Sequence, residues 1–185
     1  MLDKIIHETD DKMKKAVEFT RQELSKLRSG KATVALLDDV KVEYYGQKLP
    51  IAQVGTVSTP DPHLITVQPW DKSVTGDIVK AILAANVGLT PSNDGTVIRL
   101  PVPALTEERR KELVKVARKF VEDGRVTVRN IRRDSNEHLK KAEKDEHVSE
   151  DERKRGETEV QKLTDKYIKH LDEILNVKEK EIMEV

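Results

Sequence analysis

The 185-residue sequence contains no cysteine, few aromatic residues and no long apolar run. The absence of cysteine excludes disulfides, thiol catalysis and zinc sites with sulfur ligands. Aromatic residues make up 3% of the chain and charged residues 37%, which is more typical of amphipathic helices than of a β-sandwich. No segment has the apolar length of a membrane span, and the N-terminus is too acidic for a signal peptide. We therefore expect a soluble, mostly helical, cytoplasmic protein without a membrane partner.

The charges balance over the whole chain but not along it. Basic and acidic side chains each number 34, so the formal net charge is zero and favours neither a nucleic acid nor a membrane as partner. Locally, residues 109–133 contain ten basic and three acidic side chains, whereas residues 143–159 contain eight acidic and four basic ones. The basic segment is therefore the first candidate for a functional surface.

Three segments carry apolar residues at alternating steps of three and four, the spacing of helices that pack against one another. The first lies within residues 1–29 and is ended by Ser29 and Gly30. The second starts at the N-cap Thr106 and runs to about residue 146, and the third follows a capping box that begins at Ser149. The predicted apolar seam of the second helix comprises Leu113, Ala117, Phe120, Gly124, Val128, Ile131, Ser135, Leu139 and Ala142.

Residues 31–104 differ from the rest, because all seven prolines of the chain fall there and exclude a long helix. The alternating side chains of residues 40–45 predict a half-buried strand, and the runs LITV at 64–67 and VIRL at 97–100 predict two more. This region is therefore expected to contain a small sheet.

A short helix is expected between these strands, with Ser73 as its N-cap and Gly88 as its end. Trp70 follows a predicted strand and is expected in the core of the region. The predicted fold is therefore α+β, a long antiparallel three-helix bundle with an inserted, hinged β/α/β domain.

The order of these elements predicts the domains, because one helix precedes the proline-rich region and two follow it. Residues 1–29 and 105–185 form the predicted bundle, and residues 31–104 form the inserted domain. Two short connections near 28–31 and 103–105 then join the domains, and such a layout favours relative motion. The predicted hinge comprises Ser29, Gly30, Lys31, Pro103, Ala104 and Leu105.

A line of basic side chains follows the second long helix about 130° around its axis from the apolar seam. It comprises Lys111, Lys115, Arg118, Arg125, Arg129 and Arg132, interrupted only by the acid Glu122. The line is expected to face water and to place like charges four residues apart, which solvated helices usually avoid. One guanidinium group can donate to two oxygens of the same phosphate. A series of arginines along a helix can therefore bind successive phosphates of a nucleic-acid backbone. Because the line lacks aromatic residues for stacking, it favours structured RNA over single strands.

Two other kinds of function stay open. A non-catalytic helical scaffold could bind an acidic protein partner through the same line, and the salt dependence of RNA binding would distinguish it. An enzyme using the cleft between the domains is disfavoured, because the sequence lacks a phosphate loop, a nucleophile elbow and histidines at ligand spacing. The five histidines are expected at the surface.

Four stretches of the sequence, which lie in the same order and spacing, closely resemble the ribosome recycling factor (ribosome-releasing factor) family. They are KVEYYGQKLPIAQVGTV at 41–57, GLTPSNDGTVIRLPVPALTEERRKEL at 88–113, RNIRRDSNEHLK at 129–140 and EVQKLTDKYI at 159–168. The resemblance implies a hinged, tRNA-shaped monomer without a cofactor of its own. It also implies that the protein binds the post-termination ribosome and, with elongation factor G and GTP hydrolysis by that factor, separates the subunits.

The resemblance further implies contact residues for large-subunit ribosomal RNA on the second long helix. The family's motif maps onto Arg110, Arg129, Arg132 and Arg133. Arg28 and Gly30 match the family's segment at the first hinge strand. Lys31 stands where members often have arginine, which keeps the charge but loses the fork.

Overall fold

A computed structural model describes residues 1–145 and 147–184 of the chain. The chain divides into two compact units. One consists of Met1–Ser29 and Glu107–Val185, and the other of Gly30–Thr106, which is inserted between the two parts of the first.

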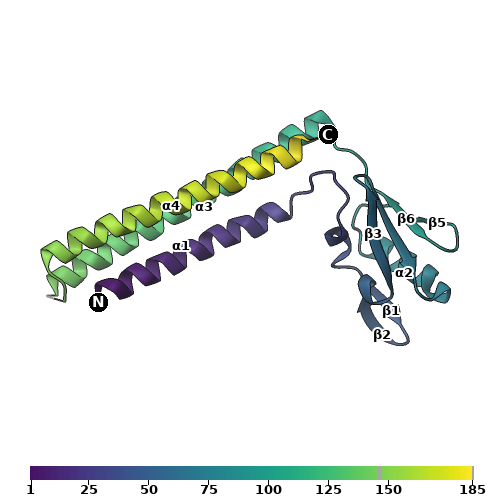
Figure 1. The fold of residues 1–185 in the computed structure, drawn as a ribbon, viewed down its shortest axis with the longest axis horizontal. Coiled ribbons are helices and arrows are strands. Elements are labelled where there is room, and N and C mark those ends of the chain that lie inside the picture. The colour runs from purple at the N-terminus through teal and green to yellow at the C-terminus, as the bar shows by residue number, and fades with distance from the viewer. Residues whose placement is uncertain (146, 185) are drawn as a thin grey trace. The chain divides into compact units, whose positions relative to one another are not determined.

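The first unit is a bundle of three helices, α1 (Leu2–Ser25), α3 (Glu107–Lys144) and α4 (Glu150–Met183). α3 runs antiparallel to both other helices (Figure 1), which confirms the predicted antiparallel bundle. The 38 residues of α3 make a rod roughly 57 Å long, at 1.5 Å per residue. The helix ends at Lys144, and Glu146, near which its end was predicted, lies outside the described residues.

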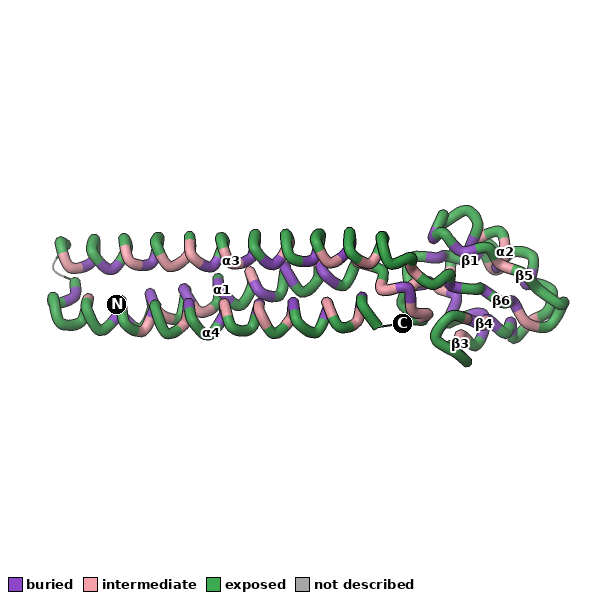
Figure 2. Tube along the Cα trace, turned by 90° about the horizontal axis from the view of Figure 1, so that it is seen from above, coloured by how far each residue is buried: buried purple, intermediate pink, exposed green. Residues whose placement is uncertain are grey.

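The bundle buries one stripe of each helix along its whole length (Figure 2). In α3 the buried residues are Leu113, Ala117, Val121, Gly124, Val128, Ser135, Leu139 and Ala142. The predicted seam is wrong at Phe120, which is half-buried because Val121 takes the inward position instead, and Ile131 is also only half-buried. A step of four followed by three fits the helix as well as the reverse order, so Val121 is fully buried in the turn before Gly124, where a Cβ would lie 2.6 Å from Thr20 Oγ1.

Hydrogen bonds fix the start of α4 and the end of α1. The Ser149 hydroxyl accepts from the Glu152 amide, and the Glu152 carboxylate accepts from the Ser149 amide, so the predicted capping box is confirmed. The predicted end of α1 at Ser29 is wrong, because the helix ends at Ser25. The Leu27 amide donates to the Leu24 carbonyl, three residues back, so the last turn is tightened and ends the helix. The Leu27 carbonyl accepts a hydrogen bond from Lys178 Nζ at 3.0 Å.

The inserted unit contains two antiparallel sheets and one helix. Its elements are β1 (Lys41–Tyr44), β2 (Gln47–Pro50), β3 (Gly55–Asp61), β4 (Leu64–Pro69), α2 (Thr75–Ala84), β5 (Ser92–Asn93) and β6 (Ile98–Pro101), with short 3-10 turns at Val34–Leu37, Ile51–Gln53 and Lys72–Val74. β1 pairs with β2, and the larger sheet has the order β3-β4-β6-β5. The core of the inserted unit includes Val40, Val42, Ile51, Ile65, Val67, Ile78, Ile82, Ile98 and Leu100.

The three predicted strands correspond to β1, β4 and β6. The prediction for the short helix is wrong at both ends, because Asp71 rather than Ser73 caps the preceding turn, and α2 ends at Ala84, before Gly88. Trp70 is 67% exposed rather than buried. Alternation along β4 directs Ile65 and Val67 into the core and the side chain of Trp70 to the opposite face, where its Nε1 donates to Thr56 Oγ1 at 3.0 Å.

Candidate functional site

The basic line of α3 separates into two rows once the neighbouring helix is taken into account. Because a helix turns 100° per residue, Arg118, Arg125 and Arg132 lie roughly 60° around α3 from the mean direction of Lys111, Lys115, Arg129 and Arg133. We call the first set the clamp row and the second set the solvent row.

The clamp row contacts α4. Arg118 Nε donates to Glu179 Oε1 at 2.6 Å, Arg125 Nε donates to Asp172 Oδ1 at 3.0 Å, and Arg132 Nη1 donates to Gln161 Oε1 at 3.3 Å. Arg118 and Arg125 are seven residues apart, as are Asp172 and Glu179, so the same geometry repeats every two turns of antiparallel helices. These arginines therefore link α3 to α4.

Arg125 is the most enclosed member of the clamp row. Its side chain is 22% exposed, and all three of its nitrogens donate to carboxylates, two to Asp172 and one to Glu122. Burial opposes its charge, but the two carboxylates outweigh burial and raise the pKa of the guanidinium. The prediction that the whole line faces water is therefore wrong at Arg125, because its place on α3 turns it toward α4.

The solvent row keeps its charges at the surface. Lys115 and Arg133 are exposed, and neither side chain has a hydrogen bond or ion pair to another described residue. Lys111 pairs with Glu107 at 3.0 Å, and Arg129 Nη1 donates to Glu122 Oε1 at 3.4 Å. The like charges four residues apart are present as expected, and acid partners reduce their repulsion at these two positions. Such exposed pairs contribute little stability, so phosphate groups can replace the carboxylates at little cost.

Glu122 is the acid that the sequence places within the basic line. Its Oε2 accepts from Arg125 Nη1 at 3.0 Å, and its Oε1 accepts from Arg129 Nη1 at 3.4 Å. The hydrogen bond from Arg125, with a smaller effect of Arg129, lowers the pKa of the Glu122 carboxyl. One carboxylate thus joins a clamp-row arginine to a solvent-row arginine.

The remaining predicted residues lie near the ends of the bundle helices and in the connecting segments. Arg110 is half-buried in the first turn of α3, and Arg28 is exposed just beyond the end of α1. Gly30 has φ of +78°, and a Cβ there would lie 2.8 Å from Leu105 Cγ. Ser29 and Lys31 are half-buried, whereas Pro103 and Ala104 are exposed.

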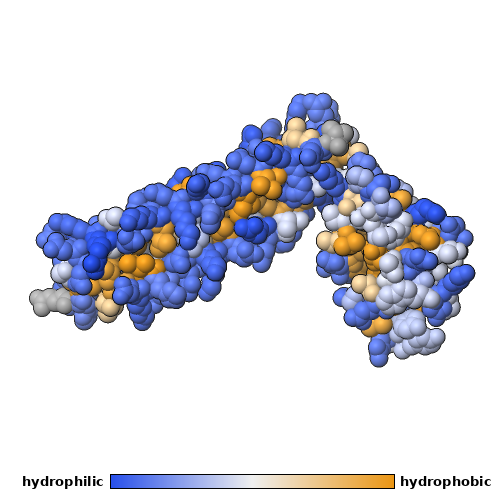
Figure 3. Space-filling model, viewed as in Figure 1, coloured by the Kyte–Doolittle hydropathy of each residue, from blue (hydrophilic) through white to orange (hydrophobic). Residues whose placement is uncertain are grey.

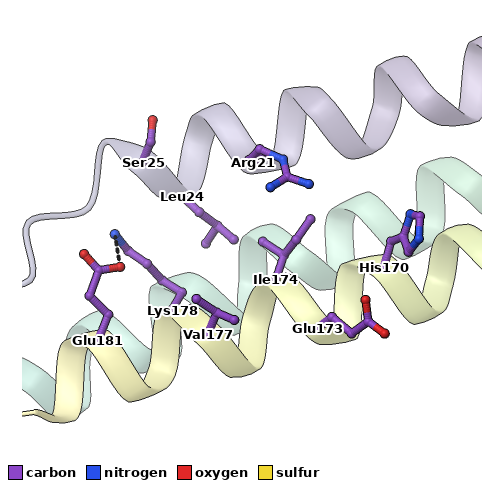
Figure 4. Close-up of a pocket in the computed structure, with 9 residues that line it drawn as sticks. All are labelled: Arg21, Leu24, Ser25, His170, Glu173, Ile174, Val177, Lys178 and Glu181. Atoms are coloured by element: carbon purple, nitrogen blue, oxygen red, sulfur yellow. Dashed lines mark ion pairs between the residues drawn. The ribbon is translucent and has the colours of Figure 1, made fainter.

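A groove of about 440 Å³ lies between α1 and α4 (Figure 4). Apolar side chains of Leu24, Ile174 and Val177 line it together with Arg21 and Glu173. Elsewhere hydrophilic side chains dominate the visible face of the bundle, and apolar ones follow the line between the helices (Figure 3). Among the described residues, no group of three or more acidic, histidine or cysteine side chains could hold a metal ion. None of the described helices is long and apolar enough to span a bilayer.

The α4 partners of the basic line, Asp172 and Glu179, were not found from the sequence. The signal was available, because their seven-residue spacing equals that of Arg118 and Arg125 on the antiparallel helix. The five histidines are exposed, as predicted.

A sequence profile described as ribosome recycling factor matches residues 20–183. The chain belongs to the ribosome recycling factor family. It is 55% identical to the ribosome-recycling factor of Carboxydothermus hydrogenoformans and 56% identical to that of Symbiobacterium thermophilum, in both cases over 185 residues and the full length of both proteins. Ribosome recycling factors are translation factors rather than enzymes, so this chain is a non-catalytic protein.

Solved structures of the family share the fold. A solution structure of the ribosome recycling factor is 47% identical, covers 100% of this chain and 98% of its own, and has a TM-score of 0.78. A second structure, of the T. thermophilus ribosome recycling factor and the E. coli elongation factor G bound to the E. coli post-termination complex, is 46% identical over all of both chains, with a TM-score of 0.63. The predicted α+β fold is thus shared by known members.

Proposed function

We propose that the protein recycles ribosomes after termination, by binding the post-termination ribosome and separating its subunits together with elongation factor G. GTP is hydrolysed by that factor, and this chain contributes binding and leverage as a monomer. Family membership supports the role in recycling. The structure of a relative with elongation factor G on the post-termination complex supports the choice of partners.

The proposed anchor is the solvent row of α3, which contacts the phosphate backbone of large-subunit ribosomal RNA. The observation that carries this assignment is that Lys115 and Arg133 are exposed and have no acid partner among the described residues. A cation that has no internal partner gains the full attraction of a phosphate. Arg110, Arg132 and Arg28 are proposed as neighbouring contacts, and Arg118 and Arg125 act mainly by joining α3 to α4.

We propose that the segments 28–31 and 103–105 act as the hinge through which elongation factor G moves the inserted unit. The division of the chain at Ser29 and Thr106 supports this proposal, since inserted units of this kind commonly move as bodies. Rotation of the inserted unit, while the bundle is held on RNA, would strain the contacts between the ribosomal subunits.

The experiment is light scattering of post-termination ribosomes mixed with elongation factor G and GTP. The protein is expected to split the ribosomes, and Arg133→Ala to split them more slowly at limiting concentration because it binds less tightly. Lys162→Ala is the matched control, because it removes one exposed charge from α4, where Lys162 pairs with Glu159. If neither the protein nor its variants split ribosomes, the proposed function is wrong, and a scaffold for an acidic protein becomes the better explanation. If Arg133→Ala and the control behave alike, the function stands and the anchor is wrong.

A further inference from the structure

The acid within the basic line has an unexpected position, because a carboxylate beside a phosphate-binding cation should weaken RNA binding by repulsion. At 100° per residue, Glu122 nevertheless lies in the direction of the solvent row, with its side chain 53% exposed. It contacts Arg125 through one oxygen and Arg129 through the other.

The side-chain contacts form a series that begins at Asp172 of α4 and ends at Arg129. Asp172 on α4 accepts two bonds from Arg125, and the third nitrogen of Arg125 donates to Glu122. Because Arg125 is 22% exposed and has every nitrogen engaged, it cannot also serve as a fork for phosphate. Its remaining effect on the surface is to hold the Glu122 carboxylate in place.

The last residue of this series of contacts is Arg129, which has fewer hydrogen bonds than Arg125. Arg129 uses only Nη1 for Glu122, at 3.4 Å, and no described residue accepts from its Nε or Nη2. Two nitrogens of its guanidinium, Nε and Nη2, therefore stay available to donate to phosphate oxygens. A long side chain that is already oriented loses less conformational freedom when it binds.

We propose that Glu122 is a positioning residue, which orients Arg129 for a phosphate group of ribosomal RNA through the chain Asp172, Arg125, Glu122 and Arg129. This inference rests on the proposed function, because it takes Arg129 as an RNA contact. It predicts that removing a negative charge from the basic surface weakens binding, which is opposite in sign to the effect of charge alone.

The test is a double-mutant cycle of Glu122→Gln and Arg129→Ala, measured as the dissociation constant for purified large ribosomal subunits. Glu122→Gln is expected to weaken binding about two- to fivefold, the range of exposed ion pairs. In the Arg129→Ala background the same substitution should have no weakening effect, because the group that it positions is gone. Glu122→Asp keeps the charge but shortens the side chain, so it should also weaken binding.

Glu112→Gln is the matched control, because Glu112 is an exposed acid on the same helix that pairs with Arg109 three residues away. It should leave binding unchanged or slightly tighter. If Glu122→Gln binds as tightly as the original protein or more tightly, the positioning role is overturned and charge alone governs the site. Equal weakening with and without Arg129 overturns it too, since Glu122 would then act through another group. If Arg129→Ala itself binds normally, Arg129 is not an RNA contact, and both the inference and that part of the anchor are wrong.

Discussion

Replacing Arg125 by methionine separates the arginines that hold the bundle together from those that bind RNA. Methionine keeps an unbranched apolar stem against the helix surface but removes the guanidinium. The Asp172 and Glu122 side chains, 48% and 53% exposed, then lose their partner but keep contact with water. The change therefore removes two ion pairs without burying an uncompensated charge.

The expected loss of stability follows from this geometry. An exposed ion pair contributes about 0.2–1 kcal/mol, and the half-buried guanidinium places these two pairs near the upper end, so about 1–2 kcal/mol should be lost. In urea unfolding followed by helical circular dichroism, a slope of about 2 kcal/mol per molar turns this loss into a midpoint lower by roughly 0.5–1 M. The slope itself should not change, because the same surface unfolds.

The matched variant is Arg133→Met, at an exposed position without an internal partner among the described residues. It should leave the free energy of unfolding within about 0.5 kcal/mol of the original. Its effect should appear in binding to large ribosomal subunits, where the slope of log affinity against log salt should fall by roughly 0.7–0.9 for one lost phosphate contact. If instead Arg125→Met lowers the salt slope by that amount and leaves stability unchanged, the division into clamp row and solvent row is refuted.

Four further substitutions test stability. In the helix interior, Gly156→Ala should destabilise the bundle by about 1–2 kcal/mol, because a Cβ would lie 2.7 Å and 2.9 Å from buried leucine side chains and overpacking outweighs the better helix propensity. Gly76→Ala, with open space around it, should instead stabilise slightly, as thermal unfolding would show. Burial, together with a hydrogen bond to an aspartate, raises the pKa of Tyr167 to about 12. The contribution of its protonated hydroxyl to stability is therefore complete below pH 10 and is lost between pH 10 and 12. The difference in free energy of unfolding between the original protein and Tyr167→Phe should shrink across that range. Gly30→Ala places a Cβ 2.8 Å from a leucine at φ of +78°, so the inserted unit should lose about 1–3 kcal/mol, visible in the fluorescence of Trp70, the one tryptophan of the chain.

The three long helices could be predicted because their signal is repeated many times. Each apolar position of α3 reports the same buried face, so the error at Phe120 did not change the predicted bundle. The end of α1 depended on single contacts instead. The carbonyl of Leu27 is held by Lys178, which lies 151 residues further along the chain, and local sequence carries no information about such a partner.

The inserted unit was predicted less completely, because its strands are short and partly exposed. β3 has mostly exposed residues, so it lacks the apolar alternation by which a strand is found. Trp70 was misplaced because its size favoured burial, whereas its position in the alternation of β4 decided its direction. At the end of a strand, the alternation of the pleat decides which face a side chain occupies and outweighs the preference of tryptophan for burial.

The basic line shows why the composition of one helix face does not by itself define a binding site. Its residues could be placed on one side of α3 from sequence alone, but whether each charge is available depends on what α4 presents to it. Arg118 and Arg125 meet Glu179 and Asp172, because residues seven apart on antiparallel helices return to the same edge of the interface. The positions rotated away from that edge, Lys115 and Arg133, have no such acid among the described residues. A charged stripe beside an apolar seam should therefore be analysed together with the facing helix, and only the cations left without an acid there should be assigned to an external phosphate.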